Sequence, residues 1–257
     1  MLNNFRGNVK YEDLPKSIRP LISWLWEMIT YFSGAREYEK EIHKKLAFGV
    51  NYVYIAGIEG DIAEFGTMTG KTASVIAKSI PKNEFRFGVT AKKLHLFDSF
   101  AGLPEADSPV DKNSPHVRSG TWTKGTCRGI SQARLIKMIN KYLPKERIAV
   151  YAGWFKDTLI NIPAGTKFAM VHIDSDLYQS AVEVLGYLFK NRLVPEGGVL
   201  FFDDYNCNLA SPKYGERRAW AETVERFTIK YTDCGEYGWG GWKFIVHSYS
   251  AGSDKGV

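Results

Sequence analysis

Short apolar runs alternate with longer amphipathic stretches from residue 61 onward, and this alternation is the feature that most restricts the fold. Six of the runs have the length of buried strands: Asp61–Phe65, Leu94–Phe97, Ile148–Tyr151, Phe168–Ile173, Val199–Phe202 and Lys243–Val246. The stretches between most of them have helical apolar spacing: Lys71–Ser79, Ser131–Tyr142, Leu177–Asn191 and Glu216–Phe227. Because strands that alternate with helices form right-handed crossovers, the pattern predicts an α/β fold with a doubly wound, mostly parallel sheet and helices on both faces.

The segment before residue 59 lacks this alternation. Leu21–Phe32 and Glu39–Ile58 each have helical apolar spacing, which predicts two helices before the first strand. With 257 residues, of which 44% are hydrophobic, the chain can bury one large core with a small addition. We therefore predict two parts: an N-terminal helical cap or lid over residues 1–58, and the main α/β domain over residues 59–257.

Composition argues against several classes of partner. The net charge of +6 is spread along the chain instead of gathering beside aromatic residues, which argues against a nucleic-acid partner. Cys127, Cys207 and Cys234 are far apart, form no CxxC pair and are odd in number, which favours a reducing compartment. The polar start of the chain is not typical of a signal peptide, and no run of apolar residues is long enough to span a membrane. We expect a cytoplasmic protein that binds neither membrane nor nucleic acid.

The turn after the first strand indicates the kind of ligand. It reads EFGTMTGKT over Glu64–Thr72, and its Gly-Lys-Thr ending suggests a P-loop. However, Gly66 and Gly70 enclose three residues instead of four, and Met68 stands where a dinucleotide fingerprint needs glycine. A carboxylate at Glu64 would repel phosphate but suits S-adenosylmethionine, which has an ammonium group, a positive sulfonium and no phosphate. The alternative is a tight turn that only packs helix against sheet.

The second strand ends at Asp98, which Ser99 follows. In open parallel sheets, ligands bind beyond the carboxyl ends of the strands, and an acid at this position can accept hydrogen bonds from ribose hydroxyls. The alternative is that Asp98 caps the following turn. Its occurrence together with Glu64, each at the end of its own strand, favours the binding role.

Four aspartates follow two strands that are consecutive along the chain. Asp174 and Asp176 come after Phe168–Ile173, and Asp203 and Asp204 come after Val199–Phe202. If these strands are neighbours, three or four carboxylates converge, and their repulsion is costly unless a cation compensates it. Oxygen ligands suit Mg²⁺, Ca²⁺ or Mn²⁺, so we predict a divalent metal site. The alternative is that some of these acids cap the helices that follow.

With these residues, the chain resembles the TylF/MycF/NovP family of sugar O-methyltransferases, the macrocin O-methyltransferase-like enzymes. The resemblance rests on stretches in the family's order from about Gly60 to Trp220: GDIAEFGTMTGKTA, LFDSFAGLPEAD, HIDSDLYQSAVEVL, PEGGVLFFDDY and GERRAW. It implies a seven-stranded class I methyltransferase sheet, S-adenosylmethionine and Mg²⁺ (or Mn²⁺) as cofactors, and a homodimer or higher homo-oligomer. The acceptor would be a sugar hydroxyl of a glycosylated natural product, a nucleotide sugar or a surface glycan.

The same resemblance implies roles for individual residues. The cofactor would be bound by residues at the strand ends: Glu64, Gly66, Thr67, Met68, Thr72, Asp98, Ser99, Gly153, Trp154 and Asp174. Asp174, Asp203 and Asp204 match the family's metal ligands. Asp176 matches a general base proposed for part of the family, and we add His116 as a second candidate base. Lys71 departs from the family, which often has glycine there, and the part before Gly60 matches only loosely.

Two alternatives to a sugar acceptor stay open. The first is a metal-dependent O-methyltransferase of a phenol or catechol, although catechol enzymes have their catalytic lysine where this chain has Leu177. The second is a catalytically inactive interaction protein with a methyltransferase fold. Walls of the acceptor site are expected from the loop Gly102–Thr126 and from aromatic side chains: Trp122, Tyr237, Trp239 and Trp242.

Overall fold

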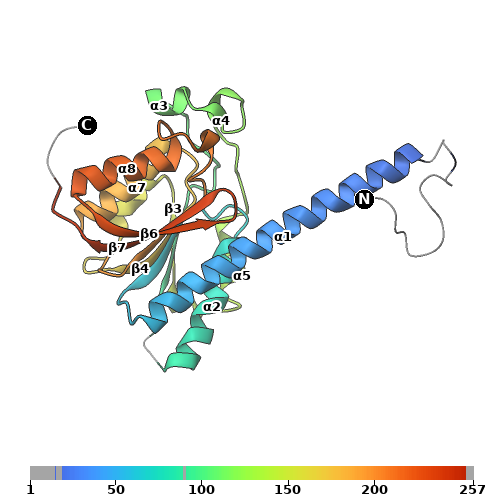
Figure 1. The fold of residues 1–257 in the computed structure, drawn as a ribbon. Helices are drawn as coiled ribbons and strands as arrows, with labels where there is room; N and C mark the ends of the chain where they lie inside the picture. Colours follow the sequence, from blue (N-terminus) through green and yellow to red (C-terminus); the bar gives the residue numbers. More distant parts are fainter. Residues whose placement is uncertain (1–14, 16–18, 89–90, 253–257) are drawn as a thin grey trace. The chain divides into compact units, whose positions relative to one another are not determined.

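The computed structural model describes residue 15 and residues 19–88 and 91–252. These residues form a seven-stranded sheet in the order β3-β2-β1-β4-β5-β7-β6 (Figure 1). The strands are β1 (Asp61–Phe65), β2 (Leu94–Asp98), β3 (Ile148–Ala152), β4 (Phe168–Ile173), β5 (Val199–Phe202), β6 (Lys230–Tyr237) and β7 (Gly241–Ser248). Strands β1 to β5 pair in parallel, whereas β7 runs antiparallel to both β5 and β6. The predicted doubly wound, mostly parallel sheet is confirmed.

Strand order reverses at β1, which pairs with β2 on one side and with β4 on the other. The chain therefore winds outward from β1 in both directions, and the carboxyl ends of β1, β2 and β4 meet at the switch point. Open α/β sheets bind their ligands in the crevice at such a point. The acids predicted as site residues lie at or just after the carboxyl ends of these strands and of β5.

Helices cover both faces of the sheet. The structure contains α1 (Arg19–Ile55), α2 (Lys71–Phe87), α3 (Pro109–Lys112), α4 (Pro115–Arg118), α5 (Gln132–Ile139), α6 (Phe155–Thr158), α7 (Tyr178–Lys190) and α8 (Gly215–Phe227). Short 3₁₀ turns lie at η2 (Lys145–Arg147), η3 (Leu159–Asn161) and η4 (Asn208–Ala210). Figure 1 shows α7 and α8 together on one face, while α2 and α5 lie on the other. Buried side chains of α7 and α8 form one core cluster with Phe65, Val171 and Phe202.

Residues Arg19–Ile55 form one continuous helix, so the prediction of two helices in this segment is wrong. The predicted break, SGAREY over residues 33–38, contains no proline. Its single glycine, Gly34, costs a helix only about 1 kcal/mol relative to alanine, which is too little to interrupt it.

The chain divides into two compact units, Met1–Ile42 and His43–Val257. The end of α1 belongs to the second unit, because Leu46 and Val50 are buried and Gly49 lies against the ring of Phe201 on β5. The division thus falls inside α1. The expected cap over residues 1–58 stays a prediction, and residues 1–14 and 16–18 of it lie outside the described part. None of the described helices is long and apolar enough to cross a lipid bilayer.

Strand β6 has no counterpart among the six predicted apolar runs. It is one of the two edge strands of the sheet, and most of its side chains are exposed or half-buried. Exposed side chains need not be apolar, so this strand has no continuous apolar run. The apolar pattern therefore could not reveal it.

Candidate active site

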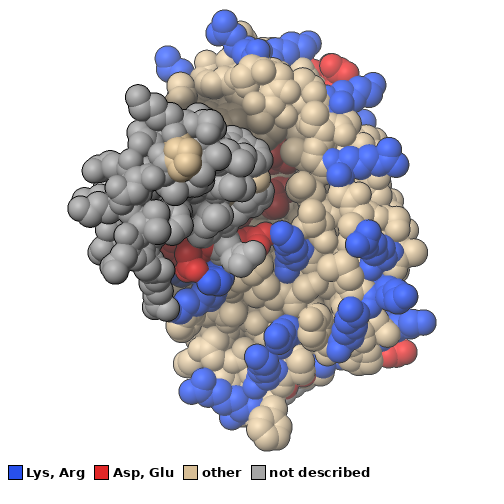
Figure 2. All heavy atoms as spheres, turned by 90° about the vertical axis from the view of Figure 1, so that its right-hand side faces the viewer, with Lys and Arg blue, Asp and Glu red and all other residues tan. Residues whose placement is uncertain are grey.

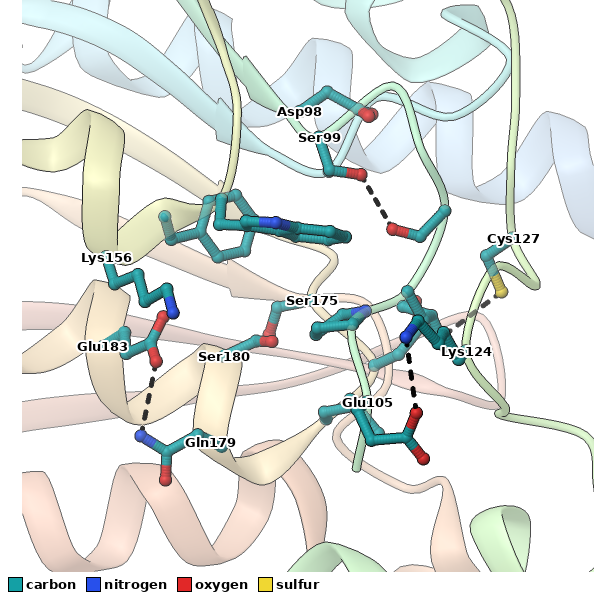
Figure 3. A pocket seen from close by; sticks show the side chains of 18 of the residues that line it. Asp98, Ser99, Glu105, Lys124, Cys127, Lys156, Ser175, Gln179, Ser180 and Glu183 are labelled. Carbon is teal, nitrogen blue, oxygen red and sulfur yellow. Dashed lines mark hydrogen bonds and ion pairs between the residues drawn. The ribbon is translucent and has the colours of Figure 1, made fainter. Parts of the chain in front are cut away.

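A pocket of about 470 Å³ opens beyond the carboxyl ends of the strands near the switch point (Figure 3). Its walls come from the turn after β1, the loop after β2, the segment after β3 and the start of α7. Many predicted site residues line it: Gly66, Met68, Asp98, Ser99, Gly153, Trp154, Asp174 and Asp176. The lining also includes Gly102 to Glu105 of the predicted acceptor loop. Other predicted site residues are outside this lining: Glu64, Thr67, Thr72, His116, Asp203 and Asp204.

Gly66 brings the first turn against the end of β4. Its φ angle is +90°, and a Cβ atom at this position would lie 1.9 Å from the carbonyl oxygen of Asp174. Its N–H donates to the carbonyl of Phe97 on β2, at 2.9 Å. Only glycine combines this backbone conformation with so close an approach, so Gly66 joins the ends of three strands at the pocket.

Asp98 holds the turn after β1 in place. Its Oδ2 accepts hydrogen bonds from the backbone N–H of Thr67 at 2.8 Å, from the Thr67 hydroxyl at 2.9 Å and from the Met68 N–H at 3.0 Å. Its Oδ1 accepts from the Phe100 N–H at 2.7 Å. Each carboxylate oxygen has about two acceptor positions. Oδ2 is therefore fully used by its three bonds, whereas Oδ1 has about one position left. The capping role is therefore present in the structure, and ribose binding by Asp98 stays a prediction.

Glu64 is fully buried beside His172, its register partner on β4. The Nδ1 atom of His172 lies 2.9 Å from Glu64 Oε1, and its Nε2 lies 3.6 Å from Asp203 Oδ1. Burial alone would lower the pKa of His172, but the neighbouring carboxylates of Asp203 and Glu64 outweigh burial and raise that pKa to about 10. Oε2 of Glu64 is buried with no hydrogen-bond partner among the described residues. Its contact with a cofactor ammonium group stays a prediction.

Three aspartates converge at the ends of β4 and β5. One carboxylate oxygen from each of Asp174, Asp176 and Asp204 lies within 4.8 Å of the other two. Asp203 lies outside this group: its Oδ1 accepts a hydrogen bond from the Tyr237 hydroxyl at 3.2 Å. The third member of the cluster is therefore Asp176, which we predicted as the base. The sequence analysis expected Asp203 as the third metal ligand. The separate roles of these two residues stay predictions.

The cluster is electrostatically strained. Burial, followed by the charges of the neighbouring carboxylates, raises the pKa values of Asp174 and Asp176 well above their ordinary range and that of Asp204 to about 7. Two thiols contact the cluster, from Cys127 to Asp176 at 3.9 Å and from Cys207 to Asp204 at 3.1 Å. Three converging carboxylates whose charges repel one another are the donor set of a hard divalent cation. The residues present thus fit the predicted metal.

Two buried acids hold the loops of the site, and the sequence analysis assigned neither a role. Glu216, in the first turn of α8, bonds to the loops that follow β4 and β5. Asp111, in α3, accepts hydrogen bonds from the N–H groups of Tyr178 and Gln179 at 2.8 and 3.1 Å, and so caps α7. Glu216 belongs to the GERRAW stretch of the family resemblance, which was its only signal. No sequence pattern links Asp111 to a helix that begins 67 residues later.

His116 is engaged away from the pocket. Its Nδ1 accepts a hydrogen bond from the N–H of Asn208 at 3.0 Å, and its ring stacks on Trp122 with centroids 4.5 Å apart. Among the other aromatic candidates, Tyr237 is buried, whereas Trp239 is 62% exposed in the turn between β6 and β7. Trp122 is buried as well, and the indole N–H of Trp242 donates to Asp233 at 2.7 Å.

Figure 2 shows how charge is distributed on one face of the molecule. Lys and Arg side chains are spread over this face, with uncharged surface between many of them. The scatter of basic residues along the sequence is thus also a scatter in space on the described part of this face.

Comparisons with known proteins agree with this architecture. The model of the family described as Macrocin-O-methyltransferase (TylF) matches residues 40–228. The 8-demethyl-8-(2,3-dimethoxy-alpha-L-rhamnosyl)-tetracenomycin-C 4'-O-methyltransferase of Streptomyces olivaceus is 30% identical over 161 residues, which are 62% of this chain and 58% of that protein. Demethyldecarbamoylnovobiocin O-methyltransferase of Streptomyces niveus is 26% identical over 149 residues, or 58% of this chain and 53% of that protein. The chain therefore matches little more than half the length of these relatives.

Solved structures share the fold. The O-methyltransferase NovP superposes with a TM-score of 0.66 at 22% identity, covering 81% of this chain and 80% of that one. The calicheamicin methyltransferase CalS11 gives a TM-score of 0.56 at 17% identity, covering 90% and 86%. TomG of Streptomyces achromogenes, solved in complex with S-adenosylmethionine, gives 0.51 at 15% identity and covers 80% of each chain. These likenesses confirm the predicted class I methyltransferase fold.

Proposed function

Because the chain belongs to the macrocin O-methyltransferase (TylF) family, we propose that it transfers a methyl group from S-adenosylmethionine to a sugar hydroxyl. The sugar would be part of a glycosylated natural product, a nucleotide sugar or a surface glycan. The names of the two relatives support this choice, since both are O-methyltransferases, of a tetracenomycin and of a novobiocin compound, and the first name specifies a rhamnosyl group. The observation that carries the proposal is that the pocket at the switch point and the aspartate cluster share Asp174 and Asp176.

The pocket fits the methyl donor in size and in chemistry. Its volume of about 470 Å³ is typical of small-molecule sites. Gly66 and Met68 of the first turn line it, and the ring of Trp154 offers an apolar surface in the lining. Directly before this turn, Glu64 has a buried carboxylate oxygen with no hydrogen-bond partner in the described part of the chain. When bound, S-adenosylmethionine supplies a methyl group on a positively charged sulfur, and a solved neighbour, TomG, binds it.

The aspartate cluster fits Mg²⁺ or Mn²⁺. Asp174 and Asp204 belong both to the geometric cluster and to the ligand set that the family resemblance implies. The third ligand is Asp203 in the resemblance and Asp176 in the geometry. A bound divalent cation would offset the carboxylate repulsion and make a coordinating hydroxyl more acidic.

The chain's own residues would act mainly by positioning. In methyl transfer, the acceptor oxygen attacks the methyl carbon from the side opposite the sulfur. Much of the lowering of the activation barrier therefore comes from the orientation of the acceptor. The walls formed by Gly102 to Glu105 and by α7 would fix that direction. Asp176 lines the pocket and is our proposed acceptor of the hydroxyl proton. His116, the second candidate, is outside the lining, which favours Asp176.

Calorimetric titration tests the cofactor. We expect S-adenosylmethionine and S-adenosylhomocysteine to bind, and ATP and NADH to bind at least about a hundredfold more weakly, because Glu64 precedes a turn unsuited to phosphate. Tight binding of ATP without binding of either sulfur compound would contradict the proposal.

Substitution of single aspartates tests the metal and the base. EDTA should abolish turnover, and Mg²⁺ or Mn²⁺ should restore it. If Asp176 accepts the proton, Asp176→Asn retains metal affinity and lowers turnover by about 10²–10⁴. If Asp176 is instead the third ligand, the same variant loses metal affinity, whereas Asp203→Asn retains it. Full turnover in the chelator would remove the metal from the proposal.

A further inference from the structure

Glu216 connects the two loops that carry the aspartate cluster. Its Oε1 accepts hydrogen bonds from the backbone N–H of Ser175 at 3.2 Å and from the Ser175 hydroxyl at 3.3 Å. Its Oε2 accepts a hydrogen bond from the backbone N–H of Asp204 at 3.0 Å. Ser175 lies between Asp174 and Asp176, so one side chain binds the backbone of both loops at the cluster.

The chemistry of these bonds requires a carboxylate. Both backbone groups are donors, and they come from different loops, so the bridging side chain must offer two acceptor oxygens. A carboxylate does so, whereas a glutamine of the same length has one acceptor oxygen and an NH₂ group that would face a second donor. Glu216 also lies in the first turn of α8, where the partial positive charge of the helix terminus favours an anion.

The position of Glu216 is costly. The side chain is fully buried and bonds to the backbone of Ser175 and Asp204, so its charge increases the repulsion among the half-buried carboxylates of the cluster. The two bonds to the loops require this carboxylate all the same. A cation in the cluster would compensate for its added negative charge.

We infer that Glu216 is a positioning residue for a divalent cation, and that it sets the separation of the loops after β4 and β5 at which their aspartates converge. This inference rests on the metal site of the proposed function. Glu216 acts through the backbone of Ser175 and Asp204, and its negative charge adds to the field that attracts the cation. Groups of this kind, one bond removed from metal ligands, commonly contribute about 10–100-fold to metal affinity.

Binding of Mn²⁺ to the full-length protein, followed by electron paramagnetic resonance of the free ion, tests the inference without any turnover. Glu216→Gln keeps the length of the side chain but removes one acceptor, and we expect it to weaken Mn²⁺ binding about 10–100-fold. Glu216→Asp keeps the charge but is one methylene shorter, and we expect it to weaken binding as well. Glu225→Gln is the matched control on α8: its carboxylate is exposed near the other end of the helix, so Mn²⁺ binding should match that of the wild type.

The affinity for S-adenosylhomocysteine, measured on the same samples, shows that each variant is folded. Unchanged Mn²⁺ affinity in Glu216→Gln would overturn the inference while leaving the proposed function intact. If Glu216→Asp retains Mn²⁺ affinity while Glu216→Gln loses it, only the charge of the side chain matters and not the bridge between the loops. That result would also overturn the inference. A wild-type protein that binds S-adenosylhomocysteine but not Mn²⁺ would refute the metal site itself, and the inference with it.

Discussion

Replacement of Asp111 by alanine should destabilise the protein through a helix to which this residue does not belong. The N-cap residue of α7 is Leu177, whose side chain cannot accept a hydrogen bond. Asp111, carried by α3, accepts instead from the N–H groups of Tyr178 and Gln179, and its Oδ2 also accepts from the Ser108 hydroxyl at 2.7 Å. It is 1% exposed, so water cannot replace these bonds without local rearrangement.

The expected loss follows from three contributions. Removal of an N-cap side chain costs about 0.5–2 kcal/mol, and hydrogen bonds to a charged group contribute about 1.5–3 kcal/mol. A negative charge at a helix N-terminus contributes up to about 1 kcal/mol more. Since these contributions overlap, we expect Asp111→Ala to lower the free energy of unfolding by about 3 kcal/mol. For a domain of this size that corresponds to a fall of about 6–12 °C in the midpoint of thermal unfolding.

Thermal and urea unfolding measure the effect. Asp111→Asn retains one acceptor oxygen and should lose about half as much stability. Asp157→Ala removes an exposed carboxylate from α6 and should change the free energy of unfolding by less than about 0.5 kcal/mol. A loss below that value for Asp111→Ala would refute the reasoning, because it would mean that α7 does not depend on a cap from α3.

Other predictions follow from single contacts. Gly66→Ala should weaken S-adenosylhomocysteine binding at least about tenfold in calorimetry, because its Cβ would lie 1.9 Å from the Asp174 carbonyl; wild-type affinity would contradict this. Asp98→Ala should weaken the same binding by about 1–3 kcal/mol, since it leaves N–H groups of the first turn unpaired. Burial alone would raise the pKa of Glu84, but the hydrogen-bonded Arg147 lowers it below 4.5. This pair therefore stabilises the fold above pH 4.5, and the contribution is lost as pH falls through the lowered pKa. Glu84→Gln should thus lower the free energy of unfolding, measured in urea near neutral pH, by about 1–3 kcal/mol. The difference between the variant and the wild type should shrink in acid. Light scattering should show a homodimer or larger assembly, and a strict monomer at micromolar concentration would contradict that prediction.

The sequence by itself determined the sheet and the edge of the sheet at which its acids gather. The predicted runs Asp61–Phe65, Phe168–Ile173 and Val199–Phe202 have the bounds of β1, β4 and β5. Buried parallel strands are continuous apolar segments, so their positions can be read from local composition. The acids that follow these strands were recognisable for the same reason, since each interrupts an apolar run at the point where a parallel strand ends. The prediction that Asp174 and Asp204 lie close together required only the order of neighbouring strands.

Only the tertiary structure decided which partner each of these acids has. Glu64 bonds to His172, Asp98 holds the turn after β1, and Asp176 joins the cluster in the position expected for Asp203. Asp111 and Glu216 bond to backbone groups of other segments, 67 and 12 residues away along the chain. A sequence pattern reports whether a segment is buried and which backbone conformation it favours. Hydrogen bonds between distant segments depend on how the loops and helices pack around the sheet, and a difference of a few ångströms there determines which carboxylates meet.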